Sequence, residues 1–146
     1  MKIAVACDHA GFPLKQRVID TVVAHGHTPI DLGTDSTAPV DYPDFAAKIG
    51  RAIQNGDADR GVLLCGSGVG AAVAACKLKG IRAAVCHDTY SAHQGVEHDD
   101  MNVLALGARI IGPEMVPELV AAYLKAAFTH EERHVRRLAK IAALER

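Results

Sequence analysis

The chain has 146 residues, 49% of them hydrophobic and 23% charged, which is typical of one globular domain with a sizeable core. Its formal net charge of -1 excludes a general electrostatic attraction to nucleic acid or to a membrane, so any phosphate site must depend on local basic residues. We find no signal peptide, no membrane-spanning stretch and no C-x-x-C pair among the four cysteines. These features predict a single cytoplasmic domain, residues 1–146, with reduced thiols.

Strand-like and helix-like segments alternate along the chain. Short apolar runs predict strands at 3–7, 28–32, 61–65, 82–86 and 102–106. Helical patterns occupy 13–25, 44–54, 71–79, 90–98 and 113–128. The alternation predicts βαβ units, a parallel sheet and right-handed crossovers.

The C-terminal segment has a different pattern. Thr129 and Glu132 have the spacing of a capping box, which predicts a helix that continues through Arg146. Its apolar residues recur every third position, at Val135, Leu138, Ile141 and Leu144. We expect this apolar face to pack on its own domain or on a partner subunit.

The most informative segment is 61–71, Gly-Val-Leu-Leu-Cys-Gly-Ser-Gly-Val-Gly-Ala. A buried strand, a glycine loop and a helix N-terminus direct free backbone N–H groups at one point, which favours an anion. Cys65 lies at the edge of this point, where the surroundings favour a reactive thiolate. The common alternative is a buried structural thiol, which is how we interpret the other cysteines, Cys7, Cys76 and Cys86.

Ligands of open parallel sheets bind outside the carboxyl ends of the strands. This rule places three separate segments at one edge of the predicted sheet. They are Cys7-Asp8-His9, Cys65-Gly66-Ser67 and Gly107-Ala108-Arg109. We therefore expect these segments to be near one another in space.

Two motifs suggest other functions. Residues 66–71 fit the dinucleotide pattern G-x-G-x-x-A, with Asp88 after the next predicted strand, although the same glycines also suit a tight turn. The fingerprint normally follows the first strand, and only two predicted strands follow it here. Residues 130–134 match H-E-x-x-H, but they open a basic terminal helix, so we interpret this match as chance rather than a zinc site.

Arg133 and Arg137 are four residues apart and share one face of the predicted terminal helix, with Arg136 and Lys140 on a neighbouring face. Most basic helix faces are simply solvated. Forked guanidinium groups suit phosphate, however, so the first pair is a candidate phosphate site.

Taken together, these motifs resemble the type B ribose-5-phosphate isomerases and their relatives that act on allose 6-phosphate and galactose 6-phosphate. The resemblance covers nearly the whole chain. It rests on 7–11, Asp-Tyr-Pro at 41–43, the loop 65–70, His98 with Asn102-Val103, 107–109, and Arg133-His134 with Arg137. It implies a Rossmann-like three-layer αβα fold with a five-stranded parallel sheet, and an aldose–ketose isomerase without metal or nucleotide cofactor.

The resemblance also implies roles for individual residues. Cys65 would be the base that moves a proton between C1 and C2, His98 would help to open the furanose ring, and Ser67 would belong to the catalytic group. The substrate would be bound by Asp8, His9, Tyr42, Gly66, Gly68, Val69, Gly70, Asp99, Arg109, Arg133, His134 and Arg137. The family's sites lie between two subunits, which implies a homodimer or a dimer of dimers that shares its terminal helices.

Asp99 departs from the family pattern, because many relatives have asparagine there. A carboxylate only accepts hydrogen bonds and would repel an oxyanion, so Asp99 is expected to bind a sugar hydroxyl instead. The most favoured substrate is ribose 5-phosphate, which would be converted to ribulose 5-phosphate. Allose 6-phosphate, galactose 6-phosphate or a four-carbon sugar phosphate remain alternatives, as do a nucleotide-binding module and a non-catalytic sugar-phosphate sensor.

Overall fold

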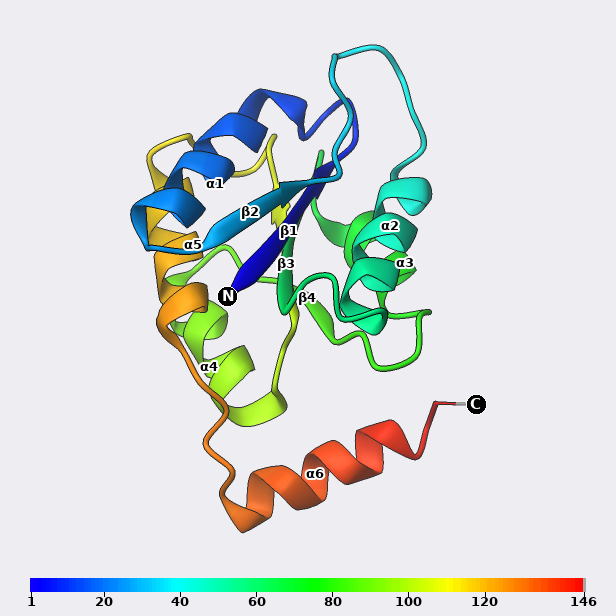
Figure 1. The fold of residues 1–146 in the computed structure, drawn as a ribbon, viewed down its shortest axis with the longest axis vertical. Coiled ribbons are helices and arrows are strands. Elements are labelled where there is room, and N and C mark those ends of the chain that lie inside the picture. Colours follow the sequence, from blue (N-terminus) through cyan, green and yellow to red (C-terminus); the bar gives the residue numbers. More distant parts are fainter. Residues whose placement is uncertain (146) are drawn as a thin grey trace.

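The computed structural model describes residues 1–145, which contain a five-stranded parallel sheet between two layers of helices (Figure 1). The strands are β1 (Lys2–Cys7), β2 (Thr28–Asp31), β3 (Arg60–Cys65), β4 (Ala83–Val85) and β5 (Val103–Gly107). Their order across the sheet is β2-β1-β3-β5-β4, and all neighbouring pairs are parallel. The predicted α/β fold with three layers is therefore confirmed.

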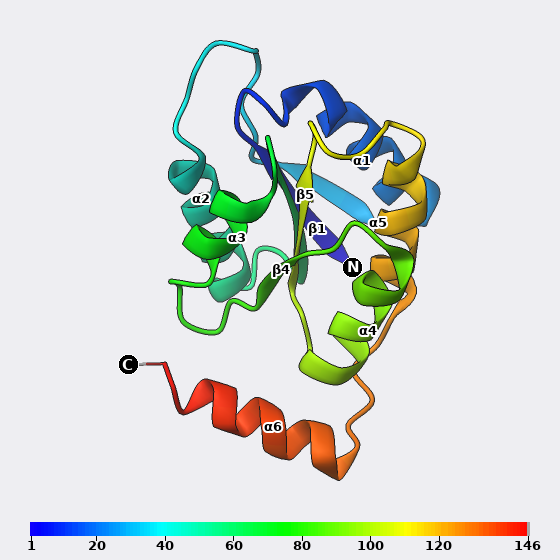
Figure 2. The same ribbon diagram turned by 180° about the vertical axis from the view of Figure 1, so that it is seen from behind.

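Helices cover both faces of this sheet. One face is covered by α1 (Phe12–Ala24), α4 (Thr89–Asp99) and α5 (Met115–Lys125), and the other by α2 (Tyr42–Gln54) and α3 (Val69–Ala75) (Figure 2). In α1 the residues Leu14, Val18 and Val22 recur every four positions and are all buried, so one stripe of the helix faces the sheet. None of the helices in residues 1–145 is long and apolar enough to cross a membrane.

The topology reverses between β1 and β3. From β1 the chain passes through α1 on one face to β2, and then through α2 on the opposite face back to β3. Such a reversal leaves a crevice outside the carboxyl ends of the two strands, where ligands bind in this class of fold. The loops that follow Cys7 and Cys65 meet at this crevice.

The predicted elements all exist, but several have different ends. The helix predicted at 71–79 is α3, which begins at Val69 and ends at Ala75, well before the left-handed turn at Gly80, whose φ is 77°. The helix predicted at 113–128 is α5, which is shorter at both ends. Strand β4 covers only three residues at the edge of the sheet.

The C-terminal helix α6 (Glu132–Ala142) differs most from its prediction. The capping box is wrong: the helix begins after Glu131, no side chain caps it, and the Thr129 hydroxyl contacts His134 instead. His130 has a left-handed φ of 57°, which turns the chain before the helix. The predicted end at Arg146 lies outside the described residues, and α6 itself ends at Ala142.

Helix α6 lies apart from the two helix layers, next to the end of α4 (Figures 1 and 2). The apolar face predicted for it is largely uncovered, since Val135, Ile141 and Leu144 are 46%, 41% and 79% exposed. Exposed apolar side chains on an extended helix are typical of a surface that another molecule covers.

Candidate active site

A pocket of about 420 Å³ lies at the carboxyl ends of β1, β3 and β5. The residues that line it come from the loops after these strands and from the start of α2 and α3. They are Asp8, His9, Ala10, Tyr42, Cys65, Gly66, Ser67, Gly70 and Arg109, with Ile110 at the edge. The parallel register aligns Cys65 with Gly107 of β5, which brings the loop after β5 beside the loop after β3.

Cys65 ends β3 and is 5% exposed. Its Sγ accepts a hydrogen bond from the backbone N–H of Gly68 at 3.0 Å. The thiol is therefore held in place at the pocket by the backbone of the loop that follows it.

The loop after Cys65 depends on Gly68. This residue has a φ of 81°, and a Cβ there would lie 3.1 Å from the backbone carbon of Leu106. The turn leaves the backbone N–H groups of Ser67 and Gly70 without an acceptor in residues 1–145, while the Ser67 Oγ accepts from Val69 N–H at 3.3 Å. Two unpaired donors beside a thiol suit an oxyanion that forms next to it.

Two loops on the other side of the pocket hold polar side chains in place. Asp8 is buried, and its Oδ1 accepts from the Gly11 N–H at 2.9 Å. His9 Nδ1 accepts from the Val40 backbone N–H at 3.1 Å, which leaves Nε2 as a donor. The hydrogen bonds orient the acidic and the imidazole side chains before any ligand arrives.

Tyr42 covers the side of the pocket next to the glycine loop. A Cβ added to Gly70 would lie 2.7 Å from the Tyr42 ring, so the aromatic side chain packs directly on the loop backbone. Arg109 approaches the same loop from the opposite side, with Nη1 3.4 Å from the position of a Cβ on Gly66. The Arg109 backbone N–H donates to the Gly66 carbonyl at 3.0 Å, which ties the two loops together. The guanidinium group is the positive charge among the pocket-lining side chains.

The other predicted site residues form a second group at the C-terminal end of α4 and on α6. His98 and His134 stack with ring centroids 4.1 Å apart and an interplanar angle of 26°. Arg133 and Arg137 are exposed on α6 close to this pair. Arg133 pairs with Glu131 at 2.8 Å and keeps the pKa of that carboxyl below its ordinary value, whereas no acidic side chain in residues 1–145 pairs with Arg137.

His134 is the buried member of this second group, with 1% of its surface exposed. Its Nδ1 lies 2.6 Å from the Thr129 Oγ1, and its Nε2 has no partner among residues 1–145. Burial, followed by the nearby His98 and Arg133, lowers the pKa of His134. The ring is therefore held uncharged at neutral pH, with one nitrogen still to be satisfied.

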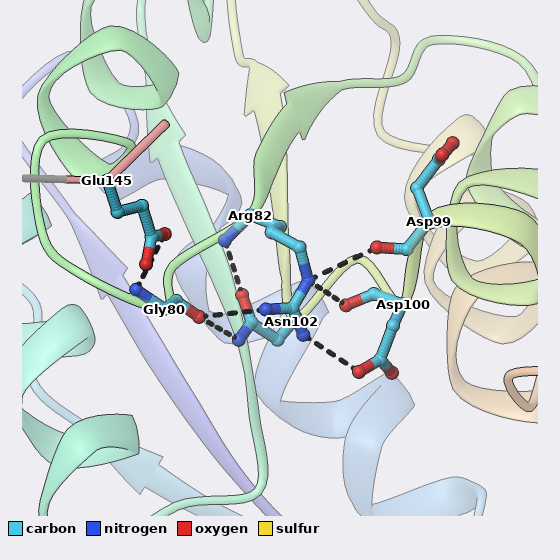
Figure 3. A network of polar contacts seen from close by, with 6 residues as sticks. All are labelled: Gly80, Arg82, Asp99, Asp100, Asn102 and Glu145. Carbon is cyan, nitrogen blue, oxygen red and sulfur yellow. Dashed lines mark hydrogen bonds and ion pairs between the residues drawn. The ribbon is translucent and has the colours of Figure 1, made fainter. Parts of the chain in front are cut away.

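A polar network fixes the end of α4 (Figure 3). Arg82 donates to the carbonyl oxygens of Asp99 at 3.1 Å and Asp100 at 2.8 Å, and it forms an ion pair with the Asp100 carboxylate at 2.8 Å. The Asp99 carboxylate points away from the network (Figure 3). It has no hydrogen-bond partner in the described chain, so it is available to accept one from a ligand.

The structure does not bring the two groups together within one chain. The pocket lies at the carboxyl ends of the strands, whereas α4 runs back along the sheet and ends, together with α6, at the opposite end of the molecule (Figures 1 and 2). Arg109 lines the pocket, whereas Arg133 and Arg137 of the same chain lie on α6 at the opposite end.

The residues of the dinucleotide pattern and of the H-E-x-x-H match have structural roles elsewhere in the fold. Asp88, the acidic residue of the dinucleotide pattern, caps α4 by accepting from the Ser91 N–H at 2.6 Å. In the H-E-x-x-H segment, His130 precedes α6 and His134 is turned into the stack with His98. Within residues 1–145 no three histidine, cysteine or acidic side chains are close enough to hold a metal ion.

Sequence patterns missed three contacts that shape the site. They are the Val40 N–H on His9, the Gln94 amide on His98 and the Thr129 hydroxyl on His134. Only the i, i+4 spacing of Gln94 and His98 was visible in the sequence. The other two join loops whose conformations leave no periodic pattern.

Comparison with known proteins agrees with this geometry. A family model described as Ribose/Galactose Isomerase matches residues 3–141. Ribose-5-phosphate isomerase B of Escherichia coli is 44% identical over 144 residues, which is 99% of this chain and 96% of that protein. D-erythrulose-4-phosphate isomerase of Pectobacterium atrosepticum is 44% identical over 130 residues, 88% of this chain and 85% of that protein.

A solved structure of ribose-5-phosphate isomerase B from Clostridium thermocellum superposes with a TM-score of 0.96 at 43% identity, covering 99% of this chain and 97% of that one. The relatives that match this chain over nearly its whole length are aldose–ketose isomerases, so the chain is an enzyme of this class. The chain belongs to the Ribose/Galactose Isomerase family, as its motifs predicted.

Proposed function

We propose that the protein interconverts ribose 5-phosphate and ribulose 5-phosphate through an enediolate, with Cys65 as the base. The observation that carries this proposal is the fixed position of the Cys65 sulfur beside the unpaired N–H groups of Ser67 and Gly70. The relative from Escherichia coli, with its 44% identity, supports the choice of the five-carbon sugar.

The reaction requires a base that removes the proton from C2 and donors that stabilise the negative charge of the enediolate oxygen. The Cys65 thiolate takes the proton from C2 of the open-chain aldose, C1 and C2 become doubly bonded, and the aldehyde oxygen becomes the enediolate oxygen. The N–H groups of Ser67 and Gly70 stabilise this oxygen. The proton of the C2 hydroxyl then passes to the C1 oxygen, C2 becomes the ketone, and C1 receives a proton from Cys65, which is left as the thiolate.

We infer that the complete site is shared between two subunits. The pocket of one subunit supplies Cys65 and Arg109, and α4 and α6 of another supply the second group. That second group is His98, Asp99, Arg133, His134 and Arg137. The exposed arginines and the uncovered apolar face of α6 support this assignment, because a dianionic phosphate needs more than one cation and an apolar helix face needs a cover. A dimer is the smallest assembly that satisfies it, and a dimer of dimers satisfies it equally.

Phosphate recognition explains why the arginines matter although they lie far from the reacting carbons. Contacts to the phosphate position C1 and C2 against Cys65, so that binding energy is used for catalysis. The Asp99 carboxylate, which the Arg82 network leaves unpaired, accepts a hydrogen bond from a sugar hydroxyl.

A turnover screen tests the proposed function. The purified protein is assayed with ribose 5-phosphate, erythrose 4-phosphate, allose 6-phosphate and galactose 6-phosphate under identical conditions. We expect the largest kcat/KM for ribose 5-phosphate. A larger value for the four-carbon sugar would assign the protein to the activity of its Pectobacterium relative. No turnover of any of these sugars would contradict the proposal.

A further inference from the structure

The stacked histidine His98 is held by a second residue of its own helix. Gln94 lies one turn before it in α4, and the Gln94 Nε2 is 2.9 Å from the His98 Nδ1. An amide nitrogen only donates hydrogen bonds, so Nδ1 must be the acceptor. An imidazole whose Nδ1 accepts carries its proton on Nε2, and it loses this hydrogen bond if Nδ1 becomes protonated.

The face of the His98 ring is also held in place. His134 stacks on it with ring centroids 4.1 Å apart and an interplanar angle of 26°. The charged groups close to the pair are Glu131 and Arg133, which form an ion pair at 2.8 Å, and Arg137. The Gln94 amide and the stack therefore fix the orientation of His98 together.

We propose that Gln94 is a positioning residue that fixes the orientation of the His98 ring and the tautomer with the proton on Nε2. This inference rests on the proposed function, in which His98 faces the sugar bound by the partner subunit. In this form His98 donates a hydrogen bond to a sugar oxygen and cannot take a proton from the substrate.

The consequence is a division of roles between two side chains. Cys65 alone exchanges a proton with carbon, and His98 stabilises oxygen. The ring oxygen of the cyclic sugar gains negative charge as its bond to C1 breaks, and an Nε2–H donor stabilises it until it takes up the proton that the C1 hydroxyl releases as the aldehyde forms.

Two substitutions of nearly equal size test this proposal. Gln94→Glu replaces the donor by an acceptor and should draw the proton to Nδ1, whereas Gln94→Met removes the hydrogen bond without reversing it. His93→Ala is the matched control, because it breaks the partly buried pair with Glu97 on the same helix and leaves the Gln94–His98 contact in place. Circular dichroism and thermal unfolding establish that each variant is folded.

The direct readout is the tautomer of His98, measured at a pH of about 8, above the ordinary histidine range. Long-range proton–nitrogen NMR of the imidazole rings, with His98→Asn to assign the signal, reports which nitrogen carries the proton. We expect Nε2 in the native protein and in His93→Ala, and Nδ1 in Gln94→Glu. A native ring protonated on Nδ1, or an unchanged tautomer in Gln94→Glu, would overturn the proposal.

The kinetic readout uses ribose 5-phosphate. We expect Gln94→Glu to lower kcat by about tenfold or more with KM changed by less than about threefold, and Gln94→Met to lower kcat by clearly less. Equal losses in the two variants would show that Gln94 only supports packing. If the native protein fails to turn over any sugar phosphate, the proposed function falls, while the tautomer measurement still decides how Gln94 and His98 interact.

Discussion

The pocket and the α4–α6 end of the molecule hold their functional side chains in different ways. Around Cys65 the loops follow buried strands and are joined by backbone hydrogen bonds, such as Ala108 N–H to the Cys65 carbonyl at 2.9 Å. At the other end, the arginines are exposed on a helix whose apolar residues are uncovered. The first group is fixed by the core of its own chain, whereas the arginines of the second group lie on the surface of α6.

This difference assigns different tasks to the two regions. A base and its oxyanion donors must be placed to within a fraction of an ångström, which a strand end and a glycine turn achieve. Phosphate contacts act through charge over a longer distance and tolerate a helix from another subunit. Substitutions in the pocket should therefore reduce kcat, and substitutions on α6 should raise KM.

The largest expected effect comes from Cys65→Ala. Loss of a general base costs about 10²–10⁴-fold in rate, so kcat for ribose 5-phosphate should fall within this range while substrate binding stays close to native. Steady-state kinetics and isothermal calorimetry measure the two quantities. Cys76→Ala is the matched control, because this thiol is exposed and lies outside the pocket. Retention of more than about half of the native rate by Cys65→Ala would move the base to another residue.

Arg137→Ala should have the next largest effect. A charge-assisted hydrogen bond contributes about 1.5–3 kcal/mol, so KM for the phosphorylated sugar should rise about 10- to 100-fold, with a smaller fall in kcat. Weak activity on unphosphorylated ribose should hardly change, because only the phosphate contact is lost. Lys140→Ala, on a neighbouring face of α6, serves as the control and should be mild. An equal rise of KM in both variants would indicate that the basic face is only solvated.

Thiol alkylation should distinguish the four cysteines. Burial raises the pKa of Cys7 and of Cys86 to about 11, so both should react slowly with iodoacetamide at neutral pH. Cys76 is exposed and should react whether or not substrate is present. Cys65 should react in the free enzyme and be protected by ribose 5-phosphate, as peptide mass spectrometry would show. Protection that is absent at Cys65 or equal at Cys76 would contradict the assignment of the pocket.

The smallest expected effect is that of metal removal. Neither the pocket nor the histidine pair in residues 1–145 has a set of ligands suited to a metal ion, and the proposed chemistry uses a thiol and N–H donors. Prolonged EDTA treatment should leave kcat and KM unchanged. Loss of activity that zinc or magnesium restores would show that a metal takes part.

Much of this architecture could be predicted from sequence because its causes are local. Apolar runs predicted β1, β3 and β5. Because ligands of parallel sheets bind at the carboxyl ends of the strands, the sequence also predicted that Asp8, Cys65 and Arg109 lie at one edge. The arrangement around His98 could not be predicted in this way. The stack with His134 depends on the left-handed turn at His130 and on the Thr129 hydroxyl, which formed no capping box. Spacing also could not show that α6 lies at the far end of its own chain, since this depends on the length and path of the segment after α5.

Subunit complementation tests the shared site most directly. Cys65→Ala and Arg137→Ala proteins are mixed, exchanged under mild denaturation and assayed at a ribose 5-phosphate concentration below the native KM, with exchange confirmed by native mass spectrometry. A mixed dimer contains one site with both residues intact. Since random exchange makes half of the dimers mixed, activity should recover to about a quarter of the native value. Confirmed exchange without any recovery would show that each site is built from a single chain.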